Sequence, residues 1–174
     1  MASRWDAVAR QIADLPRKDF KERLDDACEA DRHKLLRMRL RWHIDEFGEL
    51  IIRPIIGRTM PWYGWNAVNR QILDWPADRF EDRPRGLNQQ FLMWAPRGSA
   101  KTTTSKIRAL HALVYGLDAG MVLVAAGEDA AVGWLRTLRS WVQAGSPWMK
   151  RLWPRFGVKG SQEELIFSGG ETGN

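Results

Sequence analysis

The segment from Ala95 to Thr103 constrains the fold of this chain more than any other part, because it joins two different structural patterns. It follows the apolar run Phe91–Trp94 and precedes a helical pattern that extends to Tyr115. A strand, a short loop that ends in Lys-Thr, and a helix together form a common phosphate-binding unit. Backbone N–H groups at the start of such a helix point toward the anion, and the helix dipole adds partial positive charge.

The loop predicts a site for the phosphates of ATP, with Lys101 near the β- and γ-phosphates and the Thr102 hydroxyl as a ligand of Mg²⁺. The candidate residues are Pro96, Arg97, Gly98, Ser99, Ala100, Lys101, Thr102 and Thr103. Measured against the pattern G-x-x-x-x-G-K-[ST], both glycine positions hold alanine, at Ala95 and Ala100. Since glycine is favoured where φ is positive, Ala100 is strained if its φ is positive. The alternative interpretation is a surface turn that happens to contain Lys-Thr.

Composition limits the class of protein. A length of 174 residues allows one domain, or one domain with an appended arm, and 44% hydrophobic residues suffice for a core. The net charge of +6 is compatible with an acidic partner such as nucleic acid, although surface lysines and arginines explain it as well. The single Cys28 excludes an internal disulfide and a cysteine-based metal site. Without a long apolar run or a secretory start, we expect a cytoplasmic protein that does not span a membrane.

The N-terminal part predicts a helical arm and a connector over residues 1–60. Apolar residues recur at helical spacing over residues 3–47, and Pro16 divides this region into two helices, the second from Asp19 to Phe47. Glycines and prolines over residues 48–64 predict an irregular connector. A short helix from Trp65 to Trp75 and a polar loop over residues 77–90 follow.

The remainder, residues 61–174, predicts a partial P-loop ATPase domain of the α/β class. We expect a parallel sheet with flanking helices, incomplete at the C-terminus. The expected elements are a strand at Phe91–Trp94, a helix from Ala100 to Tyr115 capped by Gly116, a buried strand at Met121–Ala126, a helix from Asp129 to Gln143 and a strand at Glu164–Ser168. The Gly169-Gly170 pair after the last strand predicts a hairpin that turns back into the final residues.

With these elements in order, the chain resembles the N-terminal part of the large terminase subunit of tailed bacteriophages, over about residues 60–174. Pro96–Thr103 is similar to that family's loop, often P-R-G-x-G-K-[ST]. Val122–Ala131 is similar to its strand and acidic turn, and Glu164–Gly170 to its edge hairpin. The resemblance implies an ATP-driven motor that packages viral DNA, with double-stranded DNA, a portal protein and a small terminase subunit as partners.

The resemblance also implies roles for single residues. It places Arg97 near the γ-phosphate and an adenine contact within residues 62–71, where Asn66 and Gln71 both qualify. The alternative for Trp62 and Trp65 is packing in the core, which their helical spacing favours.

The catalytic groups of hydrolysis are missing from the expected pattern. Hydrolysis needs a strand-end aspartate for Mg²⁺ and a group that orients water. In the family both follow the edge hairpin, and no apolar run after residue 103 ends in Asp-Glu. Within this chain, the alternative candidate for the carboxylates that hold Mg²⁺ is Glu128-Asp129. The resemblance therefore implies a truncated chain without the second ATPase motif and the nuclease domain. A fragment of another P-loop ATPase, helicase-like or AAA-like, and a non-enzymatic basic helical adaptor or DNA-binding protein remain open.

Overall fold

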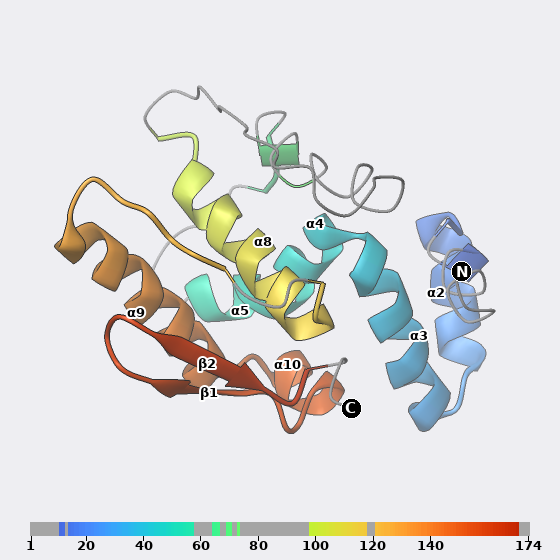
Figure 1. Cartoon of the computed structure of the whole chain (residues 1–174). Helices are drawn as coiled ribbons and strands as arrows, with labels where there is room; N and C mark the ends of the chain where they lie inside the picture. The colour runs from blue at the N-terminus through green and yellow to red at the C-terminus, as the bar shows by residue number, and fades with distance from the viewer. Residues whose placement is uncertain are drawn as a thin grey trace, which may run out of the picture.

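Helices dominate the computed structural model of this chain (Figure 1). It describes residues 11–12, 14–57, 64–66, 69–70, 73, 98–117 and 121–170. The predicted strand at Phe91–Trp94 and the predicted loop over residues 77–90 lie outside these residues. Within them the fold is mixed α/β, mostly helical with a small antiparallel sheet.

The helical segments are, in chain order, α2 (Arg17–Asp26), α3 (Glu29–Trp42), α4 (Ile44–Phe47), the π-helical η1 (Gly48–Ile52), α5 (Arg53–Ile56), α8 (Lys101–Tyr115), α9 (Glu128–Ala144) and α10 (Pro147–Leu152). They are followed by the strands β1 (Gly157–Gly160) and β2 (Leu165–Ser168), which pair antiparallel with Val158 opposite Phe167. The helix α8 packs against both α4 and α9 (Figure 1).

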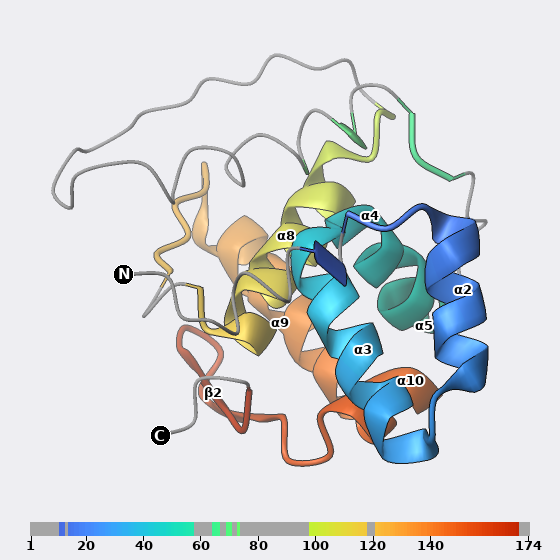
Figure 2. The same ribbon diagram turned by 90° about the vertical axis from the view of Figure 1, so that its right-hand side faces the viewer.

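The predicted long helix from Asp19 to Phe47 is wrong, because the chain breaks twice within it. The backbone is extended at Ala27 and Cys28, with ψ of 145° and 162°, and it leaves the helical region again at His43. Arg32 stabilises the first break: its Nε donates to Leu24 O at 3.1 Å, and its Nη2 donates to two further carbonyls at the end of α2. Carbonyls at a helix end need partners beyond the regular helical bonds, and Arg32 supplies them where α2 ends and the chain turns to lie beside α3 (Figure 2).

The predicted irregular connector over residues 48–64 is also wrong in its first half. The chain continues through η1 and α5 to Ile56, with Ile51 and Ile52 fully buried. Pro54 is the second residue of α5, directly after the π-helical turn of η1. Gly48 and Pro54 therefore lie where the helix type changes rather than in a loop.

The helix α8 confirms its prediction almost residue for residue. It ends at Gly116, which has a left-handed φ of 56°. The Leu117 N–H donates to Ala112 O at 2.9 Å, and the Gly116 N–H donates to Leu113 O at 3.4 Å. This pair of bonds is a Schellman motif, which satisfies carbonyls at the helix end. The predicted α9 is confirmed as well, with one more residue at each end.

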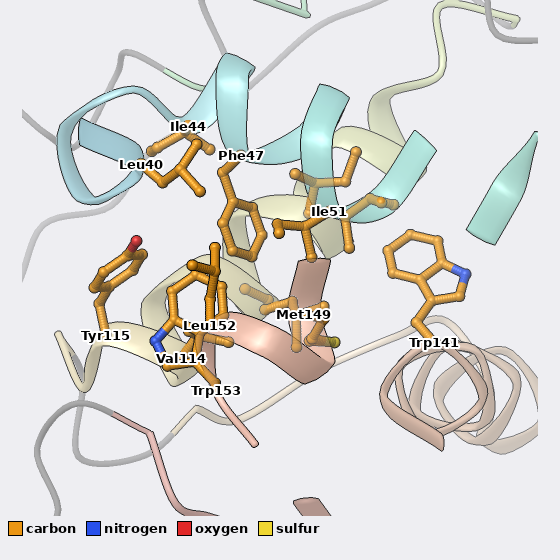
Figure 3. Packing of buried hydrophobic residues seen from close by; sticks show 14 of the residues in the cluster. Leu40, Ile44, Phe47, Ile51, Val114, Tyr115, Trp141, Met149, Leu152 and Trp153 are labelled. Carbon is orange, nitrogen blue, oxygen red and sulfur yellow. The ribbon is translucent and has the colours of Figure 1, made fainter. Parts of the chain in front are cut away.

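One continuous core joins the N-terminal helices to α8 and α10 (Figure 3). Phe47 of α4 lies edge-on to His111 at 5.1 Å and to Tyr115 at 6.4 Å between ring centroids. Trp153, just after α10, belongs to the same cluster and makes a T-shaped contact with Tyr115, with 5.4 Å between the ring centroids. Side chains from both sides of the predicted 60/61 domain boundary share this core, and the boundary itself stays a prediction.

The predicted buried strand at Met121–Ala126 is wrong. The segment has no regular structure and joins α8 to α9 as an open connection (Figure 1). Val122 is 92% exposed and Val124 is 87% exposed. A run with high strand propensity forms a ladder only beside a partner strand, and among the described residues none pairs with it.

The predicted hairpin at the C-terminal end is wrong in which segment pairs with its strand. The strand at Glu164–Ser168 is observed as β2, but it pairs with β1 before it rather than with residues after Gly169-Gly170. Arg139 of α9 donates to the carbonyls of Gly160 and Ser161 at the hairpin turn. The hairpin is thus tied to α9, and no parallel sheet is present in the described part of the chain.

Candidate phosphate-binding loop

The loop before α8 has two left-handed residues. Gly98 has a φ of 80°, and Ala100 has a φ of 55° with ψ of 19°. Ala100 is the one non-glycine residue with positive φ in the described part of the chain. The sequence pattern has glycine at this position, so the strain expected of its replacement by alanine is confirmed. Left-handed backbone costs about 1–2 kcal/mol for a residue with a Cβ atom.

The structure confirms the predicted change from loop to helix. Ala100 is the N-cap of α8, and Lys101 is its first helical residue. Ser99 is buried and Lys101 is half-buried, whereas Gly98, Ala100 and Thr102 are exposed. Thr103 is half-buried, and Pro96 and Arg97 lie outside the described residues. Alanine has no side-chain oxygen to cap a helix, so no cap at this position competes with an anion for the first N–H groups of α8.

A buried asparagine, which the sequence analysis missed, holds this loop. The side chain of Asn69 is 3% exposed, and its Nδ2 donates to Ser99 O at 2.7 Å and to Thr104 Oγ1 at 3.0 Å. The Thr104 hydroxyl in turn donates to Ala100 O at 3.1 Å. Two side chains therefore fix the two carbonyls that precede the helix.

Asn69 is itself fixed by Asn66, three residues earlier. The Asn69 N–H donates to Asn66 Oδ1 at 2.9 Å, and the Asn66 N–H donates to Asn69 Oδ1 at 3.3 Å. This reciprocal pair is the geometry of a capping box at a helix start. The spacing Asn-x-x-Asn was the signal in the sequence. The predicted adenine contact of Asn66 is untested, although its Oδ1 is already engaged, and Gln71 lies outside the described residues.

The predicted helix from Trp65 to Trp75 is observed at Asn69, Arg70 and Leu73, whereas Trp65 precedes it. Trp65 packs against Gly48, and its Nε1 donates to Asp45 O at 3.2 Å. Core packing, the alternative that the sequence favoured, is therefore confirmed for Trp65, while Trp62 lies outside the described residues.

Two further cations on α8 have structural contacts. Arg108 donates to Leu73 O, a second link between α8 and the segment that carries Asn69. Lys106 Nζ donates to Thr137 Oγ1 at 2.9 Å and lies 6.0 Å from the ring centroid of Trp134. Burial lowers the pKa of Lys106. Both cations therefore bind α8 to its neighbours.

The alternative metal-binding candidate, Glu128-Asp129, lies in the exposed first turn of α9. Negative charge there stabilises the helix through its dipole. The strand that would have presented these carboxylates as a strand-end pair is absent from the described residues. Nor do those residues contain a cluster of three or more His, Cys, Asp or Glu side chains able to hold a metal ion. Thr102 as a Mg²⁺ ligand stays a prediction.

A hollow of about 420 Å³ lies among α2, α3 and η1, and none of the loop residues line it. Its charged wall is an ion pair in which Arg39, 4% exposed, contacts Glu46 at 2.6 Å and 2.7 Å. Burial alone would raise the pKa of Glu46, but the hydrogen bond and charge of Arg39 outweigh it and lower the pKa. Arg39 also donates to Leu15 O at 2.7 Å, so its charge stabilises the N-terminal helices.

Comparisons of the chain with protein-family models, with curated proteins and with solved structures found no match. The resemblance to terminases therefore depends on the motifs quoted above and on the geometry of the loop. None of the described helices is both long enough and apolar enough to cross a membrane.

Proposed function

We propose that this chain is the ATP-binding part of a viral DNA-packaging motor, the large terminase subunit of a tailed phage. It binds the nucleotide phosphates through the loop from Arg97 to Thr103. The observation that carries this proposal is the pair of left-handed residues, Gly98 and Ala100, directly before a helix that begins at Lys101.

This geometry suits an anion for two reasons. The first N–H groups of a helix have no partner within it, and the dipole of the 15-residue α8 places partial positive charge at the same end. Lys101 adds a full charge at the first helical position. A terminal phosphate of ATP with its Mg²⁺ fits this combination, with the exposed Thr102 hydroxyl available to the metal.

The finer assignment to a terminase is supported by the order of three motifs: the loop, the acidic turn at Glu128-Asp129 and the hairpin that ends at Gly169-Gly170. The intact motor couples ATP hydrolysis to the movement of double-stranded DNA and works with a portal protein and a small terminase subunit in the host cytoplasm. This chain contributes nucleotide binding to the motor.

The first test is titration calorimetry of the full chain with Mg-ATP. We expect weak binding that Lys101→Ala reduces 10- to 100-fold, because one charge-assisted contact to phosphate is worth about 1.5–3 kcal/mol. Lys159→Ala is the matched control, because it removes the same charge from an exposed position in β1.

The control variant must bind as the unmodified chain does. Equal affinity of the Lys101→Ala and unmodified chains would exclude this loop as the site. Binding of duplex DNA by a chain that binds no nucleotide would instead favour the basic helical adaptor.

A further inference from the structure

The side chain of Asn69 controls one peptide group of the loop. Its Nδ2 donates to Ser99 O at 2.7 Å. The Ser99 carbonyl and the Ala100 N–H belong to the same planar trans peptide, so they point in opposite directions. Holding the carbonyl toward Asn69, which is buried, turns the Ala100 N–H away from the protein interior. Ala100, the residue that carries this N–H, is exposed.

The orientation of the Asn69 amide follows from its partners. Carbonyl oxygens accept hydrogen bonds only, so the atom that faces Ser99 O must be the donor Nδ2. The other atom, Oδ1, accepts from the Asn66 N–H at 3.3 Å. Swapping the two atoms would leave the Ser99 carbonyl facing an oxygen and the Asn66 N–H facing an amide group, so the arrangement is chemically unique.

We propose that Asn69 is a positioning residue for nucleotide binding, which holds the Ser99–Ala100 peptide so that the Ala100 N–H donates to a phosphate oxygen of the bound nucleotide. This inference rests on the proposed function, since it names how the same loop is set for its ligand. The fixed peptide needs no reorientation on binding, so less of the interaction free energy is lost to ordering.

The test compares Asn69→Ala with Thr104→Val in the full chain. Both variants remove a buried hydrogen bond of the Asn69 network, but only Asn69→Ala releases the Ser99 carbonyl. We expect Asn69→Ala to weaken Mg-ATP binding about tenfold, the equivalent of one hydrogen bond, and Thr104→Val to change it less than threefold. Thermal melts of both variants show how far each one destabilises the fold.

A second readout is the amide resonance of Ala100. In nitrogen-15 NMR of the unmodified chain, the Ala100 amide resonance should shift on addition of Mg-ATP, and in Asn69→Ala that shift should be lost. An Ala100 amide that does not respond to binding that depends on Lys101 would overturn the role of Asn69 and leave the proposed function standing. An unmodified chain that binds no Mg-ATP would overturn both.

Discussion

At the scale of the single residue, Ala100 combines a place in the proposed phosphate loop with backbone strain. Its φ of 55° costs about 1–2 kcal/mol relative to a relaxed residue. We expect Ala100→Gly to stabilise the chain by about 0.5–1 kcal/mol, because the relief of strain exceeds the entropy that glycine gains in the unfolded state. Urea unfolding monitored by tryptophan fluorescence measures the difference.

The control is Ala130→Gly, at an exposed position within α9, where the same substitution should destabilise by up to about 1 kcal/mol. If Ala100→Gly destabilises as much as Ala130→Gly does, Ala100 is not strained.

The buried His111 makes the stability depend on pH. Burial lowers its pKa from 6.5 to about 4, although the Leu40 carbonyl, which accepts from Nε2 at 2.9 Å, acts in the opposite direction. Between these two pH values the unfolded chain binds a proton that the folded chain does not. The free energy of unfolding should therefore fall by about 3 kcal/mol as the pH drops from 7 to 4.

Urea unfolding at a series of pH values measures the slope of the free energy of unfolding against pH. His111→Phe should unfold more easily at pH 7, because the Leu40 carbonyl loses its partner, but it should lose the slope between pH 6.5 and 4.5. Below that range Glu46 adds a slope of its own in both chains, since its lowered pKa also favours the folded state. An unchanged slope in His111→Phe would assign the effect to other groups.

At the scale of the element, the contact between η1 and Trp65 depends on the absence of a side chain at Gly48. A Cβ atom there would lie 2.4 Å from Trp65 Cζ2 and 2.8 Å from Cη2. We expect Gly48→Ala to destabilise by about 1–3 kcal/mol, as overpacking does, in thermal and urea unfolding.

Gly133→Ala is the opposite case on a neighbouring helix. A Cβ atom at Gly133 meets nothing within 4 Å, and the position is exposed within α9. Alanine should therefore stabilise by up to about 1 kcal/mol. If Gly48→Ala raises the free energy of unfolding as Gly133→Ala does, Trp65 does not pack closely on η1.

The elements also show what local sequence can and cannot predict. The helices α8 and α9 were predicted to within a residue or two, because their apolar spacing and their glycine ends are local signals. The break at Ala27–Cys28 was missed, because helical spacing continues across it and the carbonyls are satisfied by Arg32. Strands differ: Met121–Ala126 has the composition of a buried strand, but pairing requires a neighbour that composition does not specify.

The candidate site likewise has some features that local sequence predicts and others that it does not. The change from loop to helix followed from the motif, although the helix was expected to begin at Ala100 and begins at Lys101. Asn69 did not, because its role depends on a contact with Ser99, 30 residues away in sequence. Long-range polar contacts of this kind have no periodic signature, and the local Asn66 spacing indicates a helix start rather than a loop partner.

At the scale of the whole molecule, the exposed connection between α8 and α9 governs how the chain behaves in solution. Val122 and Val124 are almost fully exposed, within an apolar run whose backbone pairs with no described strand. Apolar segments with unpaired backbone recruit other chains. We expect concentration-dependent self-association in sedimentation velocity, and more of it at high salt, because salt screens the repulsion between chains of net charge +6.

A double variant, Val122→Ser with Val124→Ser, should reduce this association while leaving the melting temperature almost unchanged, because neither side chain contributes to the core. Ile166→Ser is the matched control: it removes a 58%-exposed apolar side chain from β2, a strand that already has a partner. Because a paired strand offers fewer free backbone groups, we expect the control to affect association less. A monodisperse monomer with a sharp two-state melt would contradict the prediction, and would mean that this apolar run is covered within the chain itself.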